Sequence, residues 1–166
     1  MTKHYPMTQL AEREASAEDA HIILKQGEYA VLSMVDEDGS PYGIPISYAM
    51  MNGNMYIHTG LGPGHKFENW ERDNRVSIAV AIDLEPLYMD TFFTTRYASV
   101  VASGTITHVE DPVVIRKALV ALCMKYVPEA KAEIGGAIER EFDITGVWEI
   151  TFDEVRAKAG RWKRKG

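Results

Sequence analysis

Short turns between β-prone runs are the feature that most restricts how this chain can fold. β-prone runs at 29–35, 42–50 and 55–59 are separated only by an acidic glycine turn at 36–39 and an Asn-Gly turn at 52–54. Turns of this length join antiparallel strands, because a parallel pair needs a crossover of a dozen or more residues. The first third of the chain is therefore predicted to form an antiparallel meander.

Three further strands are predicted later in the chain. Bulky apolar residues alternate with Ser and Ala over 76–82, which indicates a strand, and related runs at 97–107 and 146–153 predict two more. Pro41 and Pro45 cannot donate ladder hydrogen bonds, so their strand is expected at an edge or a bulge. About six strands joined by hairpin-length links favour a closed antiparallel barrel over a doubly wound sheet.

Local signals place helices around this sheet. Ser16 is a candidate N-cap, and Asp111-Pro112 combine a second N-cap with a proline at the first helical position. These signals predict helices over 17–26 and 112–127, a short helix from 65 to about 73, and a poorly defined helical piece at 135–142.

Length and composition indicate an ordinary globular chain. The 166 residues are 46% apolar and 25% charged, so we expect a single domain, with a core at 15–155 and a basic tail at 156–166. No apolar run is long enough to predict a membrane span, and residues 1–6 lack a signal-peptide core. Cys123 is the only cysteine, which excludes an intrachain disulfide and fits the cytoplasmic location that we expect.

The basic tail stands out because the chain as a whole carries a net charge of −6. Five of the last nine residues are Lys or Arg. Such a tail can bind nucleic acid, an anionic cofactor or an acidic partner surface, or it can be a solvated chain end. We favour the solvated end and expect no nucleic-acid partner.

The stretch from 56 to 75 is typical of a phosphate-binding site. A strand ending at Thr59 leads through a glycine-rich bend into a helix whose second residue is Lys66. Backbone N–H groups at a helix start and a lysine together favour an anion. The spacing does not match the GxxxxGK[ST] phosphate-binding loop, and a solvated surface lysine is the alternative interpretation.

Other polar residues near this bend are candidate ligand contacts. His58 and His65 flank the bend, but no Cys or Asp stands at a spacing that would complete a metal site, so we expect no metal. Each histidine is instead a candidate for a hydrogen bond or a proton transfer near neutral pH. Ser47 and Thr59 are candidate hydrogen-bonding groups for a heterocycle, and Tyr97 is a candidate ring contact. No serine or cysteine nucleophile is evident.

The order of these motifs resembles a known family. It is similar to the flavin-binding split barrels related to pyridoxamine 5′-phosphate oxidase, and most similar to their 5-nitroimidazole-resistance branch, over residues 15–155. The motifs that carry the resemblance are AVLSMV (30–35), GSPYGIPISY (39–48), MYIHT (55–59), GHK (64–66), DNRVSI (73–78) and RYASVVASG (96–104).

The resemblance implies a mainly β fold with flanking helices, a six-stranded antiparallel split β-barrel. It also implies a homodimer with FMN bound in a cleft at the subunit interface. Lys66 would hold the phosphate with His65 beside it. Ile46 and Ser47 would contact the isoalloxazine ring.

The same resemblance assigns roles to four further residues. His58 and Thr59 would lie near the ring and the ribityl chain, and His58 is the candidate catalytic residue on the substrate side. Tyr97 and Ser99 would reach the cofactor from the second subunit. The tryptophan-rich C-terminal substrate motif of the true oxidase is not recognisable, so vitamin B6 oxidation is not expected.

The expected function is thus an FMN-dependent oxidoreductase that reduces nitroimidazole or nitroaromatic compounds, with NAD(P)H as a candidate electron donor. A non-catalytic flavin- or haem-binding module is the alternative, because no acid–base pair is evident. A deazaflavin-dependent reductase on the same barrel is a third possibility.

Overall fold

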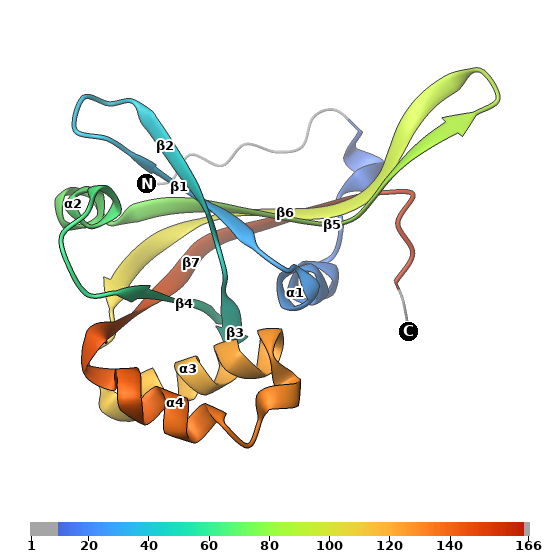
Figure 1. Ribbon diagram of the computed structural model, residues 1–166. Helices are drawn as coiled ribbons and strands as arrows, with labels where there is room; N and C mark the ends of the chain where they lie inside the picture. Colours follow the sequence, from blue (N-terminus) through green and yellow to red (C-terminus); the bar gives the residue numbers. More distant parts are fainter. Residues whose placement is uncertain (1–9, 165–166) are drawn as a thin grey trace.

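The protein is an antiparallel half-barrel sheet flanked by helices (Figure 1), described here from a computed structural model for residues 10–164. Seven strands form one sheet in the order β2-β1-β5-β6-β7-β4-β3, and all pairs are antiparallel. The strands are β1 (Ala30–Val35), β2 (Pro41–Ile46), β3 (Ala49–Met51), β4 (Asn54–Gly60), β5 (Arg75–Met89), β6 (Phe92–His108) and β7 (Thr145–Gly160).

The sheet has seven strands rather than the predicted six, because the predicted strand at 42–50 is two strands. β2 and β3 lie at opposite edges of the sheet, although only Ser47 and Tyr48 separate them in the sequence. A link this short keeps the flanking Cα atoms within about 11 Å of each other, so the sheet must curl until its edges approach. The meander predicted for 29–59 is therefore interrupted at this link.

Tyr48 explains why the strand breaks where it does. Its side chain is fully buried, and its hydroxyl donates a hydrogen bond to the Leu24 carbonyl at 2.7 Å. Its backbone N–H donates to the Tyr126 hydroxyl at 3.0 Å. The backbone at the break is thus hydrogen-bonded to a side chain of the helical layer instead of to a neighbouring strand.

The helices begin where the sequence predicts. They are α1 (Ala17–Gln26), α2 (His65–Arg72), α3 (Pro112–Tyr126) and α4 (Ile134–Glu141), with short 3₁₀ turns at Ala11–Arg13, Pro128–Ala130 and Phe142–Ile144. Ser16 and Asp19 form a reciprocal capping box at α1, and the Asp111 side chain caps α3 through the Val113 N–H. No helix among residues 10–164 has the length and apolarity required to cross a membrane.

Two hydrophobic cores share strand β4. The larger core fills the barrel and includes Met55 and Ile57, whereas the smaller core lies between α3, α4 and the sheet and includes Tyr56. Successive residues of a strand point to opposite faces, so β4 contributes alternately to the two cores. His58 has the same parity as Tyr56, which directs it toward the helical layer.

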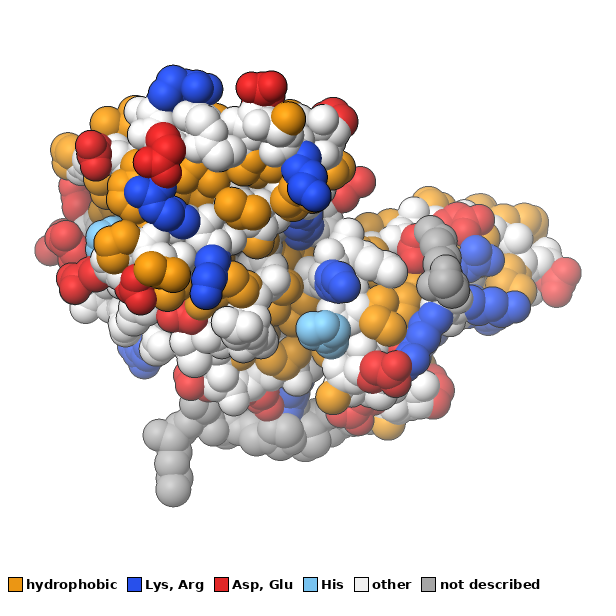
Figure 2. Space-filling view, turned by 90° about the horizontal axis from the view of Figure 1, so that it is seen from below, with side chains coloured by type: hydrophobic (Ala, Val, Ile, Leu, Met, Phe, Trp, Pro, Cys, Tyr) orange, Lys and Arg blue, Asp and Glu red, His pale blue; other side chains and the backbone are white. Residues whose placement is uncertain are grey.

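Strands β5, β6 and β7 are longer than predicted. β5 and β6 continue past the barrel as a hairpin arm (Figure 1), which also stands out from the body when seen from below (Figure 2). Its tip exposes Tyr88 and Phe93, whose ring centroids lie 4.9 Å apart. β7 extends to Gly160, so the first five residues assigned to a basic tail are part of the sheet.

The C-terminal basic residues also have partners that the sequence does not reveal. The Arg164 guanidinium forms ion pairs with Glu18 at 2.9 Å and with Asp19 at 2.6 Å. The hydrogen bond from Arg164, followed by the one from Ser16, lowers the pKa of the Asp19 carboxyl to about 2. The expectation of a solvated end is therefore wrong for residues 158–160 and Arg164, while Lys165 lies outside the described residues.

Gly104 provides a test of the β6–β7 pairing. A Cβ atom at this position would overlap the backbone carbonyl of Thr151, beside the register shift between Ser103 and Gly104. We expect Gly104→Ala to lower the free energy of unfolding by about 2–3 kcal/mol, because the backbone of β7 would have to move. Urea unfolding measures this change.

A matched control for this substitution lies in α4. A Cβ atom at Gly135 would meet nothing within 4 Å. Gly135→Ala should therefore stabilise the protein by about 0.5–1 kcal/mol through helix propensity. Equal stabilities of the two variants would contradict the close approach of β6 and β7.

Candidate functional site

The candidate site lies where the barrel is split. β2 pairs with β1 alone, and β3 pairs with β4 only over 54–56. Within residues 10–164, the end of β4 beyond Ile57 therefore has no strand partner on its β3 side. Two strand ends with free backbone hydrogen-bonding groups thus face the split, and such groups are suited to the polar edge of a heterocycle.

A pocket of about 260 Å³ occupies this split. It is lined by residues from the end of β2, the end of β4 and the helix α2 that follows β4. The lining residues are Ile44, Pro45, Ile46, Ser47, Ile57, His58, Thr59, Lys66 and Trp70.

Five residues proposed from the sequence meet in this pocket. Ile46 and Ser47 end the β2 side, His58 and Thr59 end the β4 side, and Lys66 comes from the start of α2. The glycine bend at 60–64 brings Lys66 to the pocket, because the bend turns the chain directly from β4 into α2. Gly62 has a φ of 151°, a conformation that favours glycine, and the Leu61 N–H is fixed to the Ile144 carbonyl at 3.0 Å.

The start of α2 offers hydrogen-bond donors next to Lys66. The N-cap is Gly64, which has no side chain to cap the helix, and its carbonyl accepts from Phe67 and Glu68. The N–H groups of His65 and Lys66 have no such partner among the described residues. Lys66 forms no ion pair with a described carboxylate. A lysine and two free N–H groups at a helix start are the chemistry of an anion site.

An aromatic wall that the sequence did not reveal backs this pocket. Trp70 is only 4% exposed, yet its indole N–H has no hydrogen-bond partner among the described residues. Its ring centroid lies 5.4 Å from that of Phe67 and 4.9 Å from that of Trp148. The Trp148 indole N–H in turn donates to the Thr59 hydroxyl at 3.3 Å. Trp70 comes four residues after Lys66 and so lies on the same helix face. This spacing could have identified Trp70 as a pocket residue from the sequence.

His65 lies outside the pocket. Its Nε2 is 2.8 Å from the Asp36 carboxylate, and its ring lies 4.2 Å from the ring of Tyr42. The Asn69 amide donates to the same carboxylate. Asp36, in the turn between β1 and β2, therefore fixes the orientation of α2, and His65 contributes to this anchor rather than to the pocket lining.

Tyr97 and Ser99 also lie away from the pocket within one chain. Both are on β6, where Tyr97 lies against Gly160 and the Ser99 hydroxyl donates to the Lys158 carbonyl at 3.4 Å. Neither residue lines the split. In this chain they belong to the opposite, outward-facing side of the sheet, so their predicted contact with a cofactor requires a second copy.

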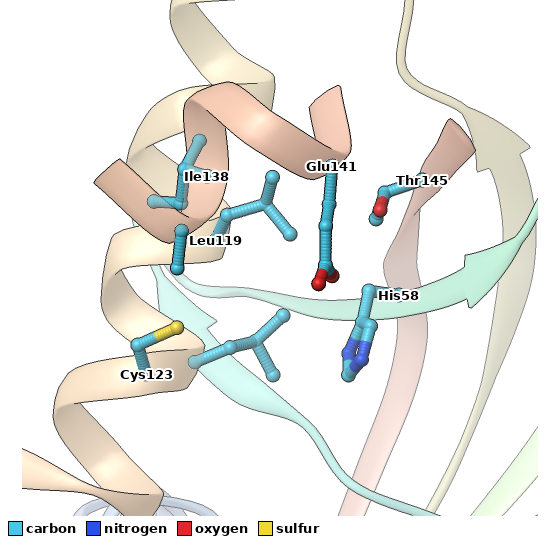
Figure 3. A pocket seen from close by; sticks show the side chains of 8 residues that line it. His58, Leu119, Cys123, Ile138, Glu141 and Thr145 are labelled. Atoms are coloured by element: carbon cyan, nitrogen blue, oxygen red, sulfur yellow. The ribbon is translucent and has the colours of Figure 1, made fainter. Parts of the chain in front are cut away.

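His58 borders a second pocket as well. This pocket lies between β4 and the α3–α4 layer, and Figure 3 shows His58 and Glu141 at one end of it. His58 is exposed and has no hydrogen bond or ion pair with the described residues. It is thus the one described side chain that lines both the split and the pocket under the helices.

No cluster of metal-ligating side chains occurs within residues 10–164.

Solved structures share this architecture. A candidate 5-nitroimidazole antibiotic resistance protein from Bacteroides thetaiotaomicron is 22% identical, with a TM-score of 0.72, over 86% of this chain and 83% of that protein. A flavocytochrome from Azotobacter vinelandii is 18% identical, with a TM-score of 0.76, over 94% and 73%. An FAD and haem binding protein from Mycobacterium smegmatis is 21% identical, with a TM-score of 0.75, over 93% and 77%.

At these identities the structural neighbours establish the fold alone. No curated protein matches the chain. The model of the pyridoxamine 5′-phosphate oxidase family, however, matches residues 16–159 and so spans the candidate site and the sheet up to its last residue but one. The chain therefore belongs to the pyridoxamine 5′-phosphate oxidase family.

Proposed function

We propose that this protein binds FMN in the split of the barrel and is an oxidoreductase that reduces nitroimidazole or nitroaromatic compounds. The observation that carries the proposal is the meeting of Lys66 and the uncapped start of α2 with two free strand ends in one pocket. This arrangement combines an anion site with a hydrogen-bonding slot, and FMN requires both.

The residues of the pocket fit a phosphorylated flat heterocycle. Lys66 and the N–H groups of His65 and Lys66 would hold the phosphate. The backbone of Ile46 and the Ser47 hydroxyl would hydrogen-bond the polar edge of the ring. The unpaired indole N–H of Trp70 is a buried donor beside this pocket, which is the kind of group that a bound ligand satisfies.

The known relatives support a flavin-type cofactor. The flavocytochrome and the FAD and haem binding protein share this fold, and their names identify flavin and haem as ligands. The family assignment points to the same chemistry. Bound FMN would supply hydride or single-electron transfer.

The chain's own residues would position the reactants. Thr59, held by the Trp148 indole N–H, stands beside His58 at the end of β4. Trp70, which packs against Phe67 and Trp148, forms an aromatic wall on one side of the pocket. His58 is free to hold or deliver a proton at the open side, because no described residue occupies its imidazole nitrogens.

Haem binding is a second candidate function, and His58 is the observation that favours it. An unpartnered imidazole at the mouth of a pocket is a possible axial ligand. The absorption spectrum of the purified protein distinguishes the two functions. Flavin bands, with the mass of FMN in the heat-released cofactor, would support the first proposal, whereas a Soret band would support the second.

We also propose that the protein is a homodimer through the outer face of its sheet. Val31, Ala79 and Val101 stand in one transverse row of β1, β5 and β6, and Val101 is 54% exposed. The next row on this face of β1, β5 and β6 consists of Ser33, Ser77 and Ser103, so another backbone can approach closely there. Tyr97 and Ser99 share this face, and a second copy would bring them toward the split.

Replacement of Lys66 tests the phosphate site. We expect Lys66→Ala to weaken FMN binding about 10- to 100-fold, since a charge-assisted hydrogen bond contributes about 1.5–3 kcal/mol. Fluorescence titration of the flavin-free protein measures the dissociation constant. Lys25→Ala, on the exposed face of α1, is the control and should leave it unchanged. An unaltered affinity in Lys66→Ala would remove this lysine from the site.

Replacement of His58 tests the catalytic assignment. We expect His58→Ala to keep its FMN but to reduce a nitroaromatic compound with NAD(P)H at least about 100-fold more slowly, in keeping with the loss of a general acid. Stopped-flow kinetics separates reduction of the flavin from its reoxidation. His21→Ala, exposed on α1, serves as the control. Loss of FMN in His58→Ala would instead make His58 a cofactor ligand.

A charge on the outer sheet face tests the dimer. We expect Val101→Glu to convert the protein to a monomer and to lower its FMN content, because the partner contacts would be lost. Light scattering after size-exclusion chromatography gives the mass. Val120→Glu introduces the same charge at a 41% exposed position of α3 and should remain dimeric. A monomeric unaltered protein at micromolar concentration would contradict the proposal.

A further inference from the structure

A second pocket lies on the other side of β4 from the barrel interior. It has a volume of about 120 Å³ and lies between β4, the start of β7 and the helices α3 and α4 (Figure 3). Its lining residues are His58, Leu119, Leu122, Cys123, Ala137, Ile138, Glu141 and Thr145. A space of this size admits at most one small ring.

The lining of this pocket is divided by polarity. Leu119 of α3 and Ile138 of α4 form an aliphatic side, together with the neighbouring small residues. Glu141, Thr145 and His58 stand on the other side, and Figure 3 shows the Glu141 carboxylate pointing toward the imidazole of His58. An apolar wall opposite convergent polar groups is the usual construction of a small-molecule site.

The charge of the pocket selects a cation. None of its lining residues is Lys or Arg. Glu141 is the last residue of α4, where the helix dipole adds partial negative charge, and it forms no ion pair with the described residues. A carboxylate at the C-terminal end of a helix is unfavourable by itself, and a bound ammonium group would relieve the repulsion. An anionic ligand would be repelled for the same reason.

We propose that this pocket binds a small single-ring amine, with its ring between Leu119 and Ile138 and its ammonium group at Glu141. His58 lines both this pocket and the split. The amine would therefore lie on the far side of the imidazole from the cofactor, where it can exchange a proton with His58. The proton exchange with the cofactor site rests on the proposed function, whereas the binding site rests on the pocket alone.

Three probes of one size and different charge test the site. Benzylamine, benzyl alcohol and benzoate are titrated into the full-length protein, with methyl NMR of Leu119, Leu122 and Ile138 as the readout. We expect benzylamine to shift these methyl resonances, benzyl alcohol to bind about three- to tenfold more weakly, and benzoate to produce no shift. Equal binding of all three probes would overturn the proposal. The absence of a shift with benzylamine at 10 mM would also overturn it, because a dissociation constant above roughly 10 mM is too weak for a specific site.

Two variants locate the binding. Glu141→Gln should lose the about three- to tenfold preference for benzylamine over benzyl alcohol and retain the binding of the alcohol. Ala137→Phe should fill the pocket and reduce the binding of both probes more than about tenfold. Glu133→Gln removes a carboxylate from the N-terminal side of the same helix, outside the pocket, and should behave like the unaltered protein. A preference that survives in Glu141→Gln would overturn the assigned contact.

The same titration in the presence and absence of FMN separates the two proposals. Benzylamine binding by a protein that takes up no FMN would contradict the proposed function and support the pocket. FMN uptake without benzylamine binding would overturn the pocket alone. With both ligands bound, we expect the ring resonances of His58 to respond to each one.

Discussion

The two-residue link at Ser47 and Tyr48 is the constraint on which the rest of the structure depends. It joins opposite edges of a seven-stranded sheet, so the sheet can only exist as a curled half-barrel. Tyr48 secures this closure, because its hydroxyl is bonded to Leu24 of α1 and its backbone N–H to Tyr126 of α3. Lys125 completes the arrangement with its ammonium nitrogen 3.5 Å from the Tyr48 ring centre. Burial lowers the pKa of Lys125 to about 8, and the cation–π contact favours the charged form that burial opposes.

The closure is also what creates the candidate site. The link brings the end of β2 beside the end of β4 but leaves each without a strand partner on the side that faces the split, and α2 lies across the gap. Asp36 holds α2 in this position through His65 and Asn69. The split, the free backbone groups and Lys66 are therefore consequences of one topological feature, and the pocket does not depend on a flexible loop.

Local signals were enough to predict the helices and most strand positions, because N-caps, prolines and glycine turns act within a few residues. The break at Ser47 was not predictable, since it results from closure of the barrel by distant segments. The arm of β5 and β6 was missed because it lies outside the barrel and has no buried face to impose an alternating pattern. Five candidate site residues meet in the split, whereas the partner of His65 and the role of Trp70 depend on contacts between segments remote in the sequence.

The two pockets on either side of His58 have opposite electrostatic character. The split contains Lys66 and the positive N-terminal end of α2, whereas the pocket under the helices contains Glu141 and the negative C-terminal end of α4. An anionic cofactor and a cationic amine would each be attracted to one side and repelled from the other. His58, as the side chain common to both pockets, then occupies the position through which a proton would pass between the two ligands.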